Sequence, residues 1–232
     1  MTKLEQLLYE AYEKRGINFV YETCSELLNI KDSSQKKPKV NGDVCETLLV
    51  FLTKKYIEER QLTGNFVRSL VLRDPDRPKS PFRTEIDFLF YTPKIIFCIE
   101  CKSYFGKKII TDKCTLDNGR YSCDIYKQNV LHTEVLHRNI ISLKYPKYRN
   151  NNKFNITMGT FFFANGDILD KRDNTFKSIL PVLTQNNLFF YYDTMLSKCT
   201  DIIWDYPKVD SFLQTIAKSE KLHNEHKEYL RY

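Results

Sequence analysis

Two apolar segments joined by a short turn restrict the fold of this chain more than any other feature. Residues 85–91 and 95–102 both have the length and the aromatic and β-branched content of strands. If four residues form the connection, Tyr91 pairs with Ile96, and Pro93 suits the second position of a type I turn. The sequence therefore predicts a β-hairpin whose register is set by its loop.

The same register brings charged side chains together at the open end of the hairpin. Counting back from the turn sets Asp87 directly opposite Glu100, where Cβ atoms are about 5 Å apart and like charges destabilise the pair. Because side chains alternate between the two faces of a strand, we expect Lys102 and Glu85 to project from the same face as these acids. The hairpin thus carries a compact group of opposed charges.

A bound divalent cation would remove the repulsion between the two carboxylates. Oxygen ligands that are few in number and leave open positions suit Mg²⁺ or Mn²⁺. Such a cation lowers the pKa of a water molecule and neutralises charge on a phosphate. Lys102 can orient or deprotonate the attacking water, or stabilise the charge that develops on the phosphate. These are the parts needed to hydrolyse a phosphodiester bond.

A simpler interpretation is a solvated acidic patch in which Lys102 is an ordinary salt-bridge partner. The Glu-x-Lys pattern recurs at 225–227, in a segment that we expect to be an exposed helix. The context of Glu100 favours the metal site, because the apolar run 97–99 before it marks a buried strand. A charged residue at the end of such a strand needs a partner or a function.

The rest of the chain alternates between predicted helices and strands, which indicates a mixed α/β (α+β) fold with a central mixed sheet flanked by helices. Thr2 is a predicted N-cap that forms a capping box with Glu5, and Asp43 is a second predicted N-cap. Apolar spacing predicts helices at 2–14, 18–29, 43–60, 124–143 and 209–230. Strands are predicted at 66–72, 107–111, 156–164 and 187–192, with a helix between the last two.

A polar, basic stretch at 31–41 resembles a linker. We therefore expect a helical N-terminal extension at 1–41, a core domain at 42–200 and a C-terminal helical extension at 201–232.

The net charge of +7 is concentrated in one segment, 127–153, which holds six basic residues and a single acidic residue, Glu134. A concentrated basic surface favours a polyanion such as nucleic acid, although a merely soluble basic protein would carry the same charge. We expect binding to weaken steeply with salt and to lack base-specific contacts. The residues expected to contact nucleic acid are Lys107, Lys108, Lys127, Arg138, Lys144, Lys147 and Arg149.

The seven cysteines are scattered, and no apolar leader segment follows Met1. We expect reduced thiols in a soluble intracellular protein, cytoplasmic or nucleoid-associated and not secreted. Cys98 and Cys101 have the spacing of half a zinc site, but residues three apart in a strand point to opposite faces. No apolar run approaches the roughly 20 residues that span a bilayer, so no membrane partner is expected.

The hairpin residues resemble the Asp…Glu-x-Lys core of the PD-(D/E)xK nuclease superfamily, and the chain is most similar to the nuclease-related domain, NERD. Asp87 stands thirteen positions before Glu100, as in that core. The other matching pieces are the helix start Gly-Asp-Val-Cys-Glu at 42–46, the Gly-containing turn at 105–109 and the Gln-bearing segment 126–129. Their order and spacing agree with the family from about 42 to 192.

The resemblance implies a restriction-endonuclease-like core, a Mg²⁺ or Mn²⁺ cofactor and a role for each matching residue. Asp87 and Glu100 would be metal ligands and Lys102 the catalytic lysine. Glu46 would be a further ligand or a water-bridged partner, the backbone carbonyl of Cys101 another ligand, and Gln128 would line the site. The chain departs from the family in a Pro-rich insertion at 74–81, in the absence of Trp and Asn-Pro between 106 and 128, and in both terminal extensions.

Some of these residues also have ordinary interpretations. Glu46 lies three residues after Asp43, which is also the spacing of a capping box. Gln128 could be an exposed helix residue. His132 and His137 are five residues apart, a poor spacing for a shared metal on a helix, so we expect surface or DNA-facing roles.

Three functions follow from this interpretation. The main hypothesis is a Mg²⁺- or Mn²⁺-dependent deoxyribonuclease in DNA processing, repair or defence. The second is a non-catalytic nucleic-acid-binding module that keeps the fold, which the loss of an acid or of the lysine would favour. The third is an RNA-directed endonuclease. Cap-snatching RNA endonucleases of the superfamily carry a histidine where this chain has Glu46, which argues against that subclass.

Overall fold

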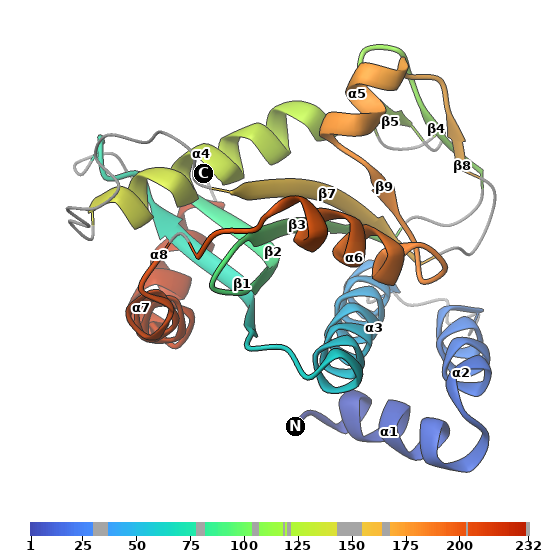
Figure 1. Cartoon of the computed structure of the whole chain (residues 1–232). Coiled ribbons are helices and arrows are strands. Elements are labelled where there is room, and N and C mark those ends of the chain that lie inside the picture. The colour runs from blue at the N-terminus through green and yellow to red at the C-terminus, as the bar shows by residue number, and fades with distance from the viewer. Residues whose placement is uncertain are drawn as a thin grey trace.

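A central β-sheet with helices on both faces organises the molecule (Figure 1). The computed structural model describes residues 1–29, 37–77, 82–103, 107–117, 119, 122–142, 155–163, 168–202 and 204–230. In spatial order the strands of the sheet are β1 (Asn65–Arg73), β2 (Arg83–Tyr91), β3 (Ile96–Lys102), β7 (Ile156–Phe162) and β9 (Val182–Leu183). The first three are antiparallel, and β7 and β9 continue the sheet in parallel with β3. This arrangement confirms the expected mixed α/β class.

Helices α3 (Lys37–Arg60) and α4 (Ile125–Ser142) cover opposite faces of this sheet (Figure 1). Three helices share the apolar cluster of α3: α1 (Lys3–Arg15), α2 (Ile17–Asn29) and α6 (Leu188–Lys198). On the other face, α7 (Tyr206–Ala217) shares the cluster of α4, and α8 (Glu220–Tyr229) contacts β1 and β2. The sheet is therefore the middle layer, and a residue at its edge can be reached from either face.

A second, smaller sheet lies where α4 begins (Figure 1). Its strands, in spatial order, are β6 (Ser122–Asp124), β5 (Thr115–Asp117), β4 (Lys108–Ile110) and β8 (Ile168–Asp170), and α5 (Asn174–Ile179) follows β8 in the chain. Ile110 and Leu116 of this sheet pack with Phe162 of β7 in one buried cluster. Because β6 leads directly into α4, the small sheet fixes the first turn of that helix beside the ends of β3 and β7.

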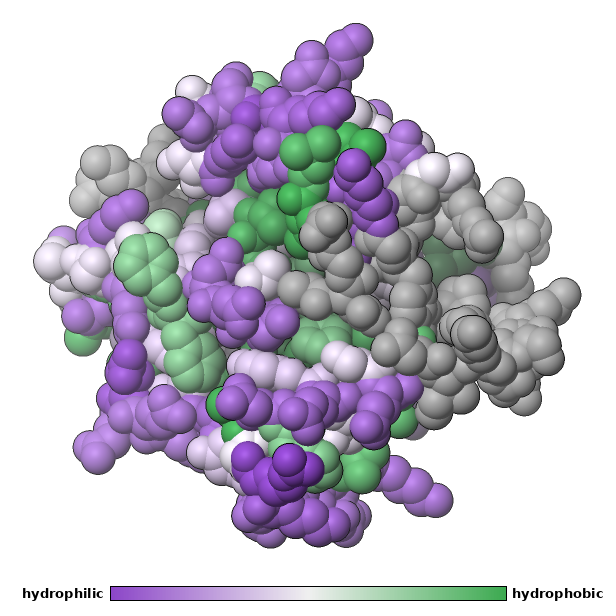
Figure 2. All heavy atoms as spheres, turned by 90° about the vertical axis from the view of Figure 1, so that its right-hand side faces the viewer, coloured by the Kyte–Doolittle hydropathy of each residue, from purple (hydrophilic) through white to green (hydrophobic). Residues whose placement is uncertain are grey.

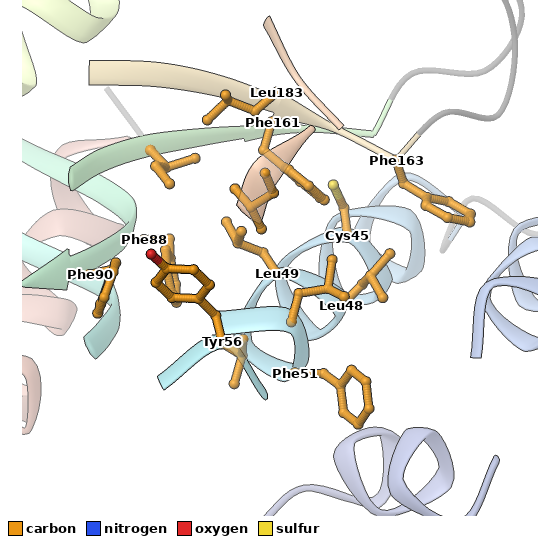
Figure 3. Close-up of a cluster of buried hydrophobic side chains, with 14 of the residues drawn as sticks. Cys45, Leu48, Leu49, Phe51, Tyr56, Phe88, Phe90, Phe161, Phe163 and Leu183 are labelled. Carbon is orange, nitrogen blue, oxygen red and sulfur yellow. The ribbon is translucent and has the colours of Figure 1, made fainter. Parts of the chain in front are cut away.

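The largest apolar cluster surrounds α3. Figure 3 shows Cys45, Leu48 and Leu49 of this helix among aromatic side chains of the strands, including Phe88 and Phe161. Intervals of three and four residues place these α3 side chains on one face of the helix. The surface is different in character: the face drawn in Figure 2 is mostly hydrophilic, with apolar residues lying between polar ones. Burial of the α3 face that carries Cys45, Leu48 and Leu49 therefore anchors the helix to the sheet.

The N-termini of the first helices test the predicted caps. Thr2 caps α1 as expected, because its hydroxyl accepts from the Glu5 N–H at 3.1 Å and its N–H donates to the Glu5 carboxylate at 2.8 Å. The Asp43 cap is wrong, since α3 begins at Lys37 and Asp43 lies inside it. Pro38 is compatible with this earlier start, because the first turn of a helix needs no backbone N–H donors. The final residues of the expected linker are thus helical.

Two other predicted elements are wrong in type or extent. The run predicted as a strand at 187–192 is the start of α6, in which Leu188 and Tyr192 are buried one turn apart while Phe190 is exposed. A short apolar run does not distinguish a buried strand from a helix. The single helix predicted at 209–230 is two helices, because Ser219 caps α8 with a hydrogen bond from the Leu222 N–H. Within the described part of the chain, no helix combines the length and apolar character needed to cross a membrane.

Candidate active site

The hairpin formed by β2 and β3 has the predicted register. Tyr91 pairs with Ile96, and the ladder runs from there to the pair Phe88–Ile99. Beyond that pair the Asp87 carboxylate replaces a backbone carbonyl as the hydrogen-bond acceptor: its Oδ2 accepts from the backbone N–H of Cys101 at 2.8 Å. A side-chain acceptor therefore continues the pairing where the ladder ends, and it holds Asp87 beside the strand that carries Glu100.

The neighbouring strand β1 is irregular at the same level. Its register would pair Ser69 with Asp87, but the ladder omits this pair and resumes on either side. Ser69 has a φ of 48°, in the left-handed region, which costs a non-glycine residue about 1–2 kcal/mol. Such a residue turns the strand, so the strict alternation of side chains is broken at this point.

The packing of the apolar side chains confirms the break. Ile86 and Leu89 of β2 are three residues apart, which would place them on opposite faces of a regular strand, yet both lie in the cluster under α4. Because the break falls at Asp87 itself, the alternation rule no longer relates the face of Glu85 to that of Asp87, and the shared face stays a prediction. The Glu85 carboxylate lies 3.3 Å from the Nε2 atom of His226 in α8.

Glu100 is almost completely buried, with 3% of its surface exposed, and three side chains surround its carboxylate. Its Oε1 accepts from Lys102 Nζ at 2.7 Å and from Gln128 Nε2 at 2.6 Å. Its Oε2 lies 3.3 Å from His132 Nδ1, but the geometry of that contact is not that of a hydrogen bond. Glu100 Oε2 is therefore a buried carboxylate oxygen with no hydrogen-bond donor among the described residues.

The two acids respond to this environment in opposite directions. Burial and then the negative charge of Glu100 raise the pKa of Asp87 well above its usual range, and the Cys101 N–H opposes the shift only in part. Burial also favours the neutral form of Glu100, but contacts with His132 and Lys102 outweigh it and lower its pKa. The environment thus shifts Asp87 toward its neutral form and Glu100 toward its ionised form.

Lys102 is the positive partner in this group. Burial alone would lower its pKa, but the charge and hydrogen bond of Glu100 raise the pKa to about 12. Its Nζ also donates to Gln128 Oε1 at 3.0 Å. Lys102 is therefore a buried, fully protonated cation held from two sides.

Glu46 adds a third acid from α3. Burial, followed by the charges of Asp43 and Glu85, raises its pKa to about 7, and Glu100 contributes in the same direction. Its charge in turn raises the pKa of Asp87. The capping-box interpretation of Glu46 is excluded, because α3 begins six residues before Asp43. Glu46 is thus close enough to influence the acids of the hairpin.

Helix α4 contributes two residues to the group, of which the sequence analysis identified one. Gln128 bridges Glu100 and Lys102, so it is not an ordinary exposed residue. His132 was expected on the surface, and this is wrong: it is 5% exposed and faces Glu100. The available signal was its position four residues after Gln128, which puts both side chains on one face of the helix.

The residues expected to contact nucleic acid separate into three sets. Lys107 and Lys127 are exposed. Lys108 has no exposed surface, whereas the Arg138 side chain is partly exposed and donates to Asp74 at 2.9 Å and to Glu134 at 3.1 Å. The remaining three, Lys144, Lys147 and Arg149, lie outside the described residues.

The cysteines form no metal site and no disulfide among the described residues. Cys98 lies in the cluster under α4, whereas Cys101 packs against the cluster of α3. The two sulfur atoms therefore lie on opposite faces of β3, as the strand geometry predicted.

Comparison with known families agrees with the resemblance found in the sequence. Residues 50–158 match the family model described as the nuclease-related domain, NERD. This segment includes Asp87, Glu100, Lys102 and Gln128, and it begins after Glu46. No curated protein and no solved structure matches the chain. The match indicates a nuclease-related function for the part of the chain that contains the hairpin.

Proposed function

We propose that this nuclease-related domain hydrolyses phosphodiester bonds of DNA with the help of Mg²⁺ or Mn²⁺, in DNA processing, repair or defence. The observation that carries the proposal is the buried carboxylate of Glu100, whose Oε2 has a 3.3 Å ion-pair contact with His132 and no hydrogen bond among the described residues, in a group with a second acid, Asp87, and a lysine. Burying a carboxylate oxygen without a donor is costly unless a cation or a ligand completes its environment.

The donor set fits a hard divalent cation. Among the described residues, no three His, Cys, Asp or Glu side chains lie close enough to hold a metal ion as they stand. Asp87 and Glu100 would therefore be the two protein carboxylates, with Glu46 and the carbonyl oxygen of Cys101 as further candidates. A site with few carboxylates leaves positions for water and phosphate oxygens, as Mg²⁺ requires. When bound, the cation supplies positive charge that offsets the negative charge of the phosphate.

The chain's own residues have separable roles in the proposed reaction. The oxygen of a water molecule forms a bond to phosphorus and the bond from phosphorus to the leaving sugar oxygen breaks. The proton of the water passes to solvent, and the leaving sugar oxygen takes up a proton from solvent. The charge and hydrogen bond of Glu100 raise the pKa of Lys102, which favours the ammonium form, so Lys102 would stabilise charge on the phosphate or orient the water. Gln128 holds the ammonium group of Lys102, and His132 restrains the carboxylate of Glu100.

A nucleic acid would approach this group across exposed basic side chains. Lys107 and Lys127 flank the small sheet and the start of α4, and both are exposed. Each phosphate contact that they make releases counterions, so replacing either with Gln should reduce the salt dependence of binding. No observation identifies a base-reading surface, and the proposal is for recognition of the backbone.

Cleavage of linear, circular and single-stranded DNA, with Mn²⁺, Mg²⁺ or EDTA, tests the proposed function. Lys102→Met removes the cation at the site, and Lys227→Met is the matched control, because it changes the same pattern of Glu-x-Lys at an exposed position of α8. We expect wild type and Lys227→Met to cut DNA only with metal, and Lys102→Met to be inactive. Equal activity of all three proteins, or cleavage that survives EDTA, would refute the proposal. Cleavage of RNA in place of DNA would refute the DNA assignment.

A further inference from the structure

The C-terminal helix α8 lies outside the segment that matches the family, yet it contacts the sheet beside the proposed active site. The imidazole of His223 lies between two backbone carbonyl groups: Nε2 is 3.0 Å from Ser69 O, and Nδ1 is 2.8 Å from Ser219 O. A carbonyl oxygen only accepts and a neutral imidazole carries one N–H, so the ring donates to one of the two carbonyls, and in the Nε2–H tautomer it donates to Ser69 O. His223 therefore ties the start of α8 to one position of β1.

That position is the irregular one. Ser69 is the single described residue of a strand, other than glycine, with φ in the left-handed region. Single residues in this region persist where surrounding contacts over-determine them. The hydrogen bond from His223 is such a contact, because it fixes the direction of the Ser69 carbonyl.

Ser69 in turn faces Asp87 across the two strands. These two residues do not form a ladder pair, although regular pairs lie on both sides of them. At Asp87 the alternation of side chains between the two faces of β2 is also interrupted. If Ser69 relaxed to an extended conformation, the regular alternation would return. The Asp87 side chain would then leave the position from which it accepts the Cys101 N–H.

The remaining contacts of α8 hold it firmly in this place. Glu225 pairs with Arg73 of β1 and with Arg83 of β2, and His226 lies 3.3 Å from Glu85 of β2. These contacts reach both strands on the far side of the irregular pair. These contacts attach α8 to both strands, and His223 of the same helix contacts Ser69.

We propose that His223 is a positioning residue for Asp87: by holding the Ser69 carbonyl, it maintains the irregular pair that aims the Asp87 carboxylate at the cation site. This inference rests on the proposed function for its catalytic consequence. Its structural part, the link from His223 through Ser69 to the Asp87–Cys101 hydrogen bond, concerns the metal-free protein alone.

Three variants of the 232-residue chain separate positioning from general stability. His223→Leu fills similar space without a donor, whereas His223→Gln keeps an N–H at a similar reach. Gln214→Leu is the matched control, because the Gln214 side chain also donates to a β1 carbonyl, that of Phe66, at 3.2 Å, but away from Asp87. A fourth protein, Ser69→Gly with His223→Leu, tests rescue, since glycine occupies the left-handed region without strain.

The first readout is hydrogen exchange of the Cys101 amide in the metal-free protein, which reports its bond to Asp87. We expect exchange at least tenfold faster in His223→Leu, near wild type in His223→Gln and Gln214→Leu, and slowed again in the double variant. The second readout is calorimetry with Mn²⁺, in which the Kd should rise at least tenfold in His223→Leu alone, with the KM for DNA unchanged and kcat reduced.

The outcomes distinguish the two proposals. If wild type neither binds Mn²⁺ nor cuts DNA, the proposed function fails, while altered Cys101 exchange in His223→Leu would still support the structural link. If wild type binds and cuts but His223→Leu matches Gln214→Leu in exchange and in Kd, the positioning role is wrong and the proposed function stands. If His223→Leu does not fold, His223→Ala replaces it as the test variant. Cys101 amide exchange in folded His223→Ala at the wild-type rate would then overturn the inference.

Discussion

The Oδ2 atom of Asp87 accepts a 2.8 Å hydrogen bond from the backbone N–H of Cys101, directly beyond the last ladder pair of the hairpin. One side chain thereby completes the backbone pairing of β3 and lies beside Glu100. The structural role of Asp87 needs only an acceptor, whereas the proposed metal site needs its charge. Variants can therefore separate the two roles.

Asp87→Asn should abolish Mn²⁺ binding without unfolding the protein. Asparagine keeps an acceptor for the Cys101 N–H and removes the repulsion from Glu100, so metal-free stability should equal that of wild type or exceed it by up to about 1 kcal/mol. Calorimetry with Mn²⁺ and urea unfolding measure the two effects, with the exposed Glu26→Gln as control. Retained Mn²⁺ affinity would move the site elsewhere in the chain.

His132→Leu should reduce kcat by about 10- to 100-fold and leave the KM for DNA unchanged, as expected for loss of a group that orients a metal ligand. The reason is the 3.3 Å contact of His132 with Glu100, which lowers the pKa of that carboxyl. His137→Leu is the control, because His137 is partly buried on the same helix but lies five residues further on. Equal activity of both variants would remove His132 from the site.

Acid should weaken the contact between α8 and the sheet. Hydrogen bonds from Arg73 and Arg83 lower the pKa of Glu225 to about 2, below its ordinary value of 4.5. The folded state thus binds the proton less readily than the unfolded state, so the stabilisation is fully present above about pH 4.5 and is lost as the pH falls toward 2. Urea unfolding between pH 2 and 6 should therefore show a smaller pH dependence for Glu225→Gln. The same substitution at exposed Glu228 should leave the dependence as in wild type, and identical curves for all three proteins would contradict this account.

Truncation in the α3 cluster should be far more costly than truncation of the apolar surface of α6. Leu49 has no exposed surface, so Leu49→Ala should lower the free energy of unfolding by about 2–5 kcal/mol. Phe190 is 74% exposed, and Phe190→Ala should change it by no more than about 0.5 kcal/mol. Chemical denaturation measures both. A large loss of stability in Phe190→Ala would argue against the helical register of α6, which buries Leu188 and Tyr192 and exposes this ring.

Local patterns predicted the hairpin correctly because a strand pair with a short loop has few possible registers. The turn around Pro93 and the pairing of Tyr91 with Ile96 needed only adjacent sequence, as did the capping box at Thr2. The acids and the lysine of the candidate site followed from the same register. The proposed division into a core and two extensions is still a prediction, although side chains of α1 and α2 share the apolar cluster of α3.

What the sequence by itself determined is therefore the hairpin and most of the helices, which depend on short-range spacing, whereas the chemistry of the candidate site stays a prediction. Only the tertiary structure decided that His132 is buried against Glu100, that α6 is a helix and that His223 contacts Ser69. These features join residues far apart in the chain, and their free energies come from burial and from hydrogen bonds that exist only after the layers pack. The break at Ser69 is the clearest case: no local pattern favours a left-handed serine within a strand, and a histidine more than 150 residues away supports it.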